Sequence, residues 1–133
     1  MKHLKDFLKD LVILLEEDHP QELAQIIALA TGIVLLQKLD QDISVLSVRK
    51  GRIHISSSWK AVRPAAEIIL SRKVLFQILE GRLTLENALR RDKVMVRADP
   101  RTILRCYSIW EKVIELSRMS PRFYFLTYGL MAE

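Results

Sequence analysis

The chain has 133 residues, of which 50% are hydrophobic and 28% charged, so it is the right size for one domain with a sizeable core. No apolar run is long enough to span a bilayer, and the N-terminus lacks the layout of a signal peptide. The single cysteine, Cys106, excludes an internal disulfide framework. We therefore expect one cytoplasmic domain over residues 1–133, with N-terminal helices in 1–31, a sheet-and-helix core in 32–118 and a tail in 119–133.

Charge divides the chain into two unlike parts. Residues 1–48 carry 4 Lys and Arg against 8 Asp and Glu, a net charge of −4, whereas residues 49–133 carry 17 against 8, a net charge of +9. Such an asymmetric molecule could turn one side toward an anionic lipid surface or a nucleic acid. The alternative is a solvated surface that only keeps the protein soluble.

Two helices are predicted at the start of the chain. Apolar residues repeat at helical spacing across 3–18, and this face is wide enough to cover more than one surface. His19 ends the first helix, because a residue before proline disfavours helical geometry. Pro20 begins the second helix, and Gly32 ends it.

Three strands are predicted next, over residues 32–39, 43–48 and 52–59. Lys50 and Gly51 form the hairpin turn between the last two, with glycine supplying a positive φ. The third strand alternates between apolar and polar side chains, which is typical of a sheet with one face in water.

Four elements then follow with almost no connecting residues. A short apolar strand covers Ala66–Leu70, and Ser71 is suited to cap the helix after it. Gly81 is placed to end that helix in the left-handed conformation. Thr84 is suited to cap a second, short helix, and residues 93–98 alternate as a strand does.

A long helix is predicted after this segment. Asp99 caps it and Pro100 fits its first position. Its apolar face, within 103–116, is too wide to contact the sheet alone, so its further neighbour is the first helix, a second subunit or a bound lipid. No further helix or strand is predicted beyond Pro121, and the aromatic stretch 123–128 could cover the core or a cavity mouth.

The segment around Gly81 resembles the sterol carrier protein-2 domain family. The matching features are a strand ending in a polar cap, a helix with the apolar pair Ile78-Leu79, the tripeptide Gly81-Arg82-Leu83, and a following helix with the small residue Ala88. The resemblance covers roughly residues 43–116. The last strand departs from the family pattern, because Asp92 and Ala98 stand where glycines are common.

The resemblance implies an α/β (α+β) fold: a mostly antiparallel, five-stranded twisted sheet with helices packed on one face. It also implies an apolar cavity between sheet and helices that holds lipids or other long apolar molecules without chemistry. The positions that would contact the ligand lie on the central helix and its turn, the short helix, the last strand and the final helix: Phe76, Leu79, Leu83, Leu89, Val94, Val96, Ile103, Tyr107, Trp110 and Ile114.

No residue pattern for catalysis or metal binding is present. The three histidines stand apart in the sequence, with no spacing typical of zinc ligands and no nucleophile elbow. Cys106 lies on the apolar side of a predicted helix, where burial makes a thiol unreactive. The sequence therefore argues against an enzyme, a cofactor and a metal site.

A basic stretch suggests where partners could bind. Arg90, Arg91 and Lys93 would contact an anionic membrane surface, which would make the protein peripheral to the membrane. Nucleic acid is disfavoured, because the stretch lacks interleaved aromatic residues. Two function classes stay open: a lipid carrier, and an accessory or scaffold subunit of a lipid or isoprenoid-quinone biosynthetic assembly, with a protein partner or a homodimer.

Overall fold

The computed structural model describes residues 3–60 and 62–131. Helices and strands follow in this order: α1 (Leu4–Asp18), α2 (Pro20–Ala30), β1 (Leu35–Leu39), β2 (Asp42–Arg49), β3 (Arg52–Ser56), β4 (Ala66–Leu70), α3 (Arg72–Leu79), α4 (Leu85–Arg90), β5 (Val94–Arg97), α5 (Pro100–Met119) and α6 (Pro121–Met131). None of these helices is long and apolar enough to cross a membrane.

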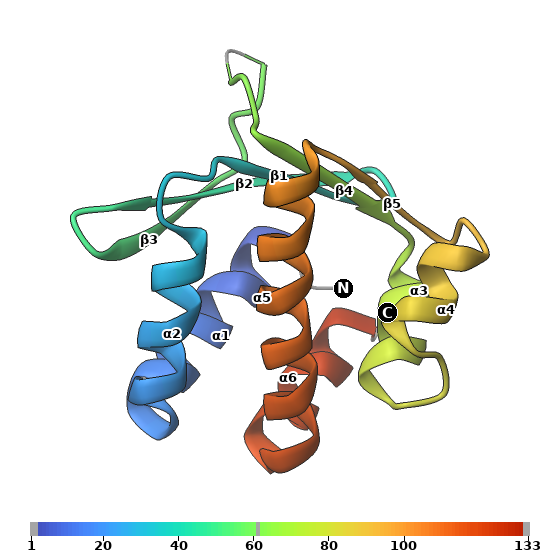
Figure 1. The fold of residues 1–133 in the computed structure, drawn as a ribbon. Coiled ribbons are helices and arrows are strands. Elements are labelled where there is room, and N and C mark those ends of the chain that lie inside the picture. Colours follow the sequence, from blue (N-terminus) through green and yellow to red (C-terminus); the bar gives the residue numbers. More distant parts are fainter. Residues whose placement is uncertain (1–2, 61, 132–133) are drawn as a thin grey trace.

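The five strands form one twisted sheet in the order β3-β2-β1-β4-β5, and the helices lie on one face of it (Figure 1). Three strand pairs are antiparallel, but β1 and β4 pair in parallel at the centre. The sheet is therefore mixed, and the expectation of a mostly antiparallel sheet is correct only in part. The connection after β3 returns the chain across the sheet, so β4 runs in the same direction as β1, and the sequence carries no sign of this pairing.

The predicted helix caps are confirmed. The side chains of Ser71, Thr84 and Asp99 each accept a hydrogen bond from the backbone N–H three residues on, over 3.1, 3.1 and 2.9 Å. The hydrogen bond from the Thr102 N–H holds the pKa of Asp99 below its usual value. These caps fix where α3, α4 and α5 begin, and so how they leave the sheet.

The turns use left-handed backbone where the sequence indicated it. Gly81 has φ +80°, and Lys50 and Gly51 have φ 52° and 74° in the β2–β3 hairpin. Asp92, at a position where the resemblance led us to expect glycine, adopts φ 56°. Aspartate is one of the few residues that tolerate this conformation. The turn geometry is thus retained without the glycine.

Element boundaries differ most from the prediction in β1 and β3, whereas β2 and β5 differ by one residue at each end. β1 begins at Leu35 rather than at Gly32, which has φ +83° and ends α2. β3 ends at Ser56 rather than at Trp59, because its pairing with β2 stops there. The residues after Ser56 belong to the long connection that leads to β4.

The largest correction concerns the C-terminal tail. Residues 121–131 form helix α6, although the sequence analysis predicted no element after Pro121. Ser120 caps this helix through a 3.2 Å hydrogen bond from the Phe123 N–H, and proline fits a first helical turn. Phe123 is 1% exposed and Leu130 is buried. The tail does cover the core, but as a helix packed on α1, α3 and α5.

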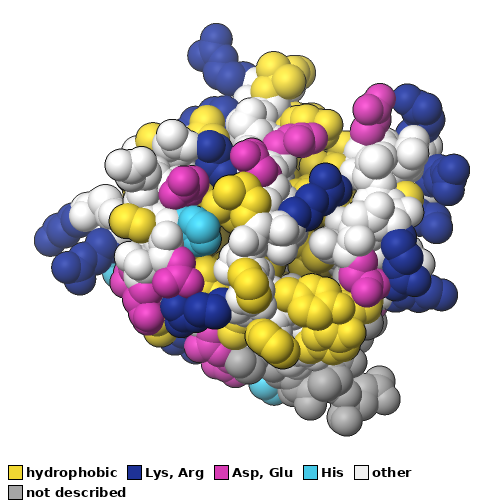
Figure 2. Space-filling view, turned by 90° about the horizontal axis from the view of Figure 1, so that it is seen from below, with side chains coloured by type: hydrophobic (Ala, Val, Ile, Leu, Met, Phe, Trp, Pro, Cys, Tyr) yellow, Lys and Arg dark blue, Asp and Glu magenta, His cyan; other side chains and the backbone are white. Residues whose placement is uncertain are grey.

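The outer side of α6 carries exposed aromatic residues. Tyr124 and Tyr128 pack edge to face with 4.9 Å between ring centroids, and Phe125 is 73% exposed. Figure 2 shows large hydrophobic side chains grouped at this end of the molecule. The buried and exposed residues of α6 thus divide it into an inner and an outer face.

The wide apolar face of α5 finds its further neighbours within the chain. α2 packs along α5, where Arg105 donates a 2.9 Å hydrogen bond from Nε to the carbonyl of Leu29. Lys112 of α5 also contacts Gln25 of α2. The sequence suggested the first helix, a second subunit or a bound lipid as this neighbour, and the second helix, which was not expected, packs there.

A buried guanidinium joins four distant parts of the chain. Arg72, 9% exposed, donates to the carbonyl of Leu130 and to the carboxylate of Asp42, both over 3.0 Å. Asp42 also accepts a 2.7 Å hydrogen bond from the Leu4 N–H at the start of α1. This cluster ties α1, the β1–β2 turn, α3 and the end of α6 together.

Candidate ligand-binding cavities

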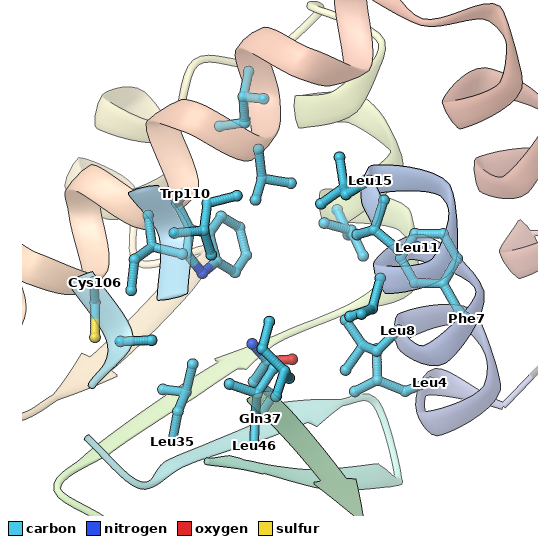
Figure 3. A pocket seen from close by; sticks show the side chains of 18 of the residues that line it. Leu4, Phe7, Leu8, Leu11, Leu15, Leu35, Gln37, Leu46, Cys106 and Trp110 are labelled. Carbon is cyan, nitrogen blue, oxygen red and sulfur yellow. The ribbon is translucent and has the colours of Figure 1, made fainter. Parts of the chain in front are cut away.

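The larger of two cavities lies between the sheet, α1, α2 and α5 and has a volume of about 130 Å³. α1 supplies much of its wall (Figure 3) through Leu4, Phe7, Leu8, Leu11 and Leu15. The helical repeat of apolar residues in α1 places these side chains on one face. α2, α3 and α5 complete the wall, and Phe123 of α6 contributes one ring.

The floor of this cavity is the sheet. Leu35, Gln37 and Leu39 alternate along β1, so their side chains point to the same face as the helices. Leu46 lies beside Leu35 on β2. Among the described residues that line the cavity none carries a charge, and Gln37 has the only side-chain amide. The cavity therefore suits an apolar molecule with few polar groups.

A second cavity, of about 50 Å³, lies on the other side of α5, between α4, β4 and β5. Cys106 and Trp110 line both cavities, so α5 separates them with these two side chains. Burial raises the pKa of the Cys106 thiol, and the nearby Arg105 opposes this only in part. The thiol is thus protonated at neutral pH and acts as part of the wall.

The sequence suggested ten residues for contact with a ligand. Three of them line the larger cavity: Leu79, Trp110 and Ile114. Most of the walls of this cavity were missed, because the resemblance begins only at residue 43. The wide apolar face of residues 3–18 was the available signal. Gln37 was missed as well, although it stands between Leu35 and Leu39 at an inward position of the strand.

The smaller cavity takes most of the other predicted residues: Leu89, Val94, Val96, Ile103, Tyr107 and, from its other side, Trp110. A hydrogen bond with Glu111 raises the pKa of Tyr107. Two predicted residues line neither cavity. Phe76 packs edge to face on Tyr128 at 5.9 Å, and Leu83 is buried in the core.

The predicted membrane-contact residues lie at the turn from α4 to β5. Arg90, Arg91 and Lys93 are all exposed, and Arg90 forms a 3.1 Å ion pair with Glu86 on the same helix. Figure 2 shows Lys and Arg side chains gathered on the side where Figure 1 places α3, α4 and β5. This turn flanks the smaller cavity.

No arrangement for catalysis stands out in the described part of the chain. Residues 3–60 and 62–131 hold no group of three or more His, Cys, Asp or Glu side chains that could bind a metal ion. Cys106 is buried. The described geometry offers apolar space and a few hydrogen-bonding groups.

No protein-family model matches the chain, and neither does any curated protein. Solved structures do match in fold. A ubiquinone synthesis protein described as UbiJ-SCP2 matches with a TM-score of 0.61 and 15% identity, over 91% of this chain and 98% of that one. The sterol carrier protein domain 2 of Helicoverpa armigera matches with a TM-score of 0.56 and 14% identity, over 86% and 84%.

A third match is sterol carrier protein 2 from Yarrowia lipolytica, with a TM-score of 0.52 and 16% identity over 82% of this chain and 88% of that one. At such identities the likeness concerns the fold. It agrees with the order of elements around Gly81 from which the resemblance was drawn. The chain therefore has the fold of the sterol carrier protein-2 domains.

Proposed function

We propose that the protein binds a lipid or another long apolar molecule in the larger cavity, without changing it chemically. The observation that carries this proposal is a cavity of about 130 Å³ whose described lining residues bear no charge. Burial of apolar ligand surface would drive binding, at about 25 cal/mol per Å². Sterol carrier proteins of similar fold support the proposal.

The volume limits what fits without movement. An engineered apolar cavity of about 150 Å³ holds benzene. The cavity here, of about 130 Å³, thus accepts a ring-sized group or a short piece of chain. A longer ligand requires α1, α2 and α5 to move apart, or must extend out of the cavity. We expect the bound protein to differ from this structure in the spacing of these helices.

Titration with the neutral fluorescent probe N-phenyl-1-naphthylamine tests the proposal. Binding should saturate, and Leu79→Trp should abolish it by filling the cavity. Leu104→Trp is the matched control, because Leu104 is 69% exposed on α5. Mass spectrometry of a solvent extract of the purified protein would identify a natural ligand. Equal binding by both variants would contradict the proposed location.

A second candidate function is an accessory role in lipid or isoprenoid-quinone synthesis. It is favoured by the match to a ubiquinone synthesis protein over nearly the whole of both chains. Cells that lack the protein should then contain less quinone, and wild-type protein should restore it. The cavity-filling Leu79→Trp variant should restore it only if lipid binding is not required.

We also propose that Arg90, Arg91 and Lys93 bring the protein to anionic membranes from which a ligand is loaded. Each such residue near an anionic surface contributes about 1 kcal/mol, screened beyond about 8 Å at physiological salt. The opposing interpretation is that these residues only keep the turn in water. The ion pair between Arg90 and Glu86 is consistent with it, because this pair already neutralises one of the charges.

Vesicle co-sedimentation distinguishes the two interpretations. Binding should require anionic lipid, fall with added salt and weaken in an Arg90→Glu/Arg91→Glu variant. Arg49→Glu/Arg52→Glu makes the same change of charge at the exposed β2–β3 hairpin and should retain binding. Equal binding to neutral and anionic vesicles would refute the membrane contact.

A further inference from the structure

One polar side chain reaches the larger cavity from its floor. Gln37 lies at the middle of β1, the central strand of the sheet, and Figure 3 shows its amide rising toward the space between α1 and α5. Its amide makes no hydrogen bond to any residue in 3–60 or 62–131. An amide carries two donors and an acceptor, so it enters an apolar space with its hydrogen-bonding capacity unused.

A second unused polar group stands beside it. Ser44 of β2 is the cross-strand partner of Gln37, so both side chains point to the helix face of the sheet. Ser44 is 0% exposed, and its Oγ has no hydrogen-bond partner among the described residues. Buried hydroxyls are nearly always satisfied, since an unsatisfied one costs free energy. The buried Ser44 and the half-buried Gln37 beside it thus mark a polar position in the sheet.

The wall opposite the floor offers a further donor. Trp110 faces the same space as Gln37 in Figure 3, and its indole N–H makes no hydrogen bond to the described residues. None of the described residues in the lining is charged. A charged ligand group would thus find no side chain of opposite charge among the described residues of the wall.

From this arrangement we propose that Gln37 binds the polar group of an uncharged lipid, such as a hydroxyl, an ester or a ring carbonyl. The inference rests on the proposed lipid-binding function and specifies its ligand class. The Gln37 amide can donate to a carbonyl and can either donate to a hydroxyl or accept from it.

The same arrangement selects against ionised lipids. A carboxylate that enters the cavity loses its hydration, and the described residues of the wall include no lysine or arginine to replace it. The cavity therefore discriminates by charge between molecules of equal chain length. A free fatty acid would bind more weakly than the matching alcohol at neutral pH.

Displacement of bound N-phenyl-1-naphthylamine by three ligands of one chain length tests this inference: decan-1-ol, decane and decanoate at neutral pH. We expect decan-1-ol to bind roughly 3- to 10-fold more tightly than decane, and decanoate to bind most weakly. Gln37→Leu should remove the advantage of the alcohol over decane. Gln41→Leu is the matched control, because Gln41 is exposed four residues further on.

Gln37→Met provides a second variant of similar shape, and thermal unfolding shows that both variants fold. The inference is overturned if decanoate binds as tightly as decan-1-ol, or if Gln37→Leu weakens decan-1-ol and decane equally. In either case the carrier function would stand, because the probe still binds. Absence of binding by the probe and by all three ligands would overturn both the carrier function and this inference.

Discussion

The two cavities on either side of α5 share Cys106 and Trp110 but differ in size and in chemistry. The larger one lies where α2 and α5 run away from the sheet and touch it only near one end (Figure 1). The smaller one lies where the short helix α4 faces β4 and the edge strand β5. The volume of the cavity between the sheet and the helices thus depends on the angle at which the helices leave the sheet.

The first prediction concerns the helix that closes the larger cavity. Phe123→Ala should lower the free energy of unfolding by about 4 kcal/mol, because a ring that is 1% exposed is lost next to an existing cavity. Urea denaturation followed by circular dichroism measures this. Phe125→Ala, on the same helix but 73% exposed, should change it by less than about 0.5 kcal/mol. Similar losses in both variants would show that α6 does not close the cavity as described.

The second prediction concerns the charged cluster that holds α1 and α6 on the larger cavity. Arg72→Leu should cost about 3 kcal/mol, because Asp42 and the Leu130 carbonyl lose their shared partner. Arg82→Leu removes an exposed arginine paired with Glu80 and should cost less than about 0.5 kcal/mol. Probe binding should also weaken in Arg72→Leu. Unchanged stability would show that water compensates for the lost guanidinium.

The third prediction concerns the side chain between the cavities. Trp110→Phe should cost about 1 kcal/mol and should abolish the change in tryptophan emission that decan-1-ol produces. Trp59→Phe makes the same exchange at a residue that is 41% exposed and should leave the emission change intact. A ligand-induced change that survives in Trp110→Phe would place the ligand away from α5.

The smallest expected effect concerns the thiol between the cavities. Burial raises the pKa of Cys106, so the unfolded chain releases its proton at lower pH than the folded one. The stability that this group contributes is complete below about pH 8.5, the ordinary range of a thiol pKa, and should fall as the pH rises further. Cys106→Ala should reduce this fall, measured by urea denaturation across the alkaline range. An identical pH dependence in both proteins would show that water reaches the thiol.

The local features of the fold were predictable because each depends on neighbouring residues. Ser71, Thr84 and Asp99 cap helices through groups three residues away, and Gly51 and Gly81 supply positive φ in turns. Pairings between distant strands were not predictable, because the direction of a strand relative to its neighbour depends on the path of long connections. α6 was missed because a proline was interpreted as an end, when the preceding serine makes it a beginning.

The candidate site was predictable only where the resemblance covered it. The suggested residues come from the second half of the chain, so they describe α5 and the smaller cavity more fully than the larger one. The α1 residues that line the larger cavity lie on an amphipathic face. The sequence does not show which part of the protein this face packs against, so their place in the cavity could not be predicted. Gln37 could be recognised as a candidate ligand-binding residue only after the structure showed the cavity above it.

The parallel pairing of β1 with β4 has a consequence for folding kinetics. Leu35 pairs with Ala66, so this contact must wait for the closure of a long loop. A slip of one residue would turn Glu67 toward the helices, because strand side chains alternate. Asp40 marks the correct register, since its N–H donates to the Leu70 carbonyl over 3.0 Å and its carboxylate accepts from the Arg72 N–H over 3.2 Å. We therefore expect this alignment to be a slow step of refolding.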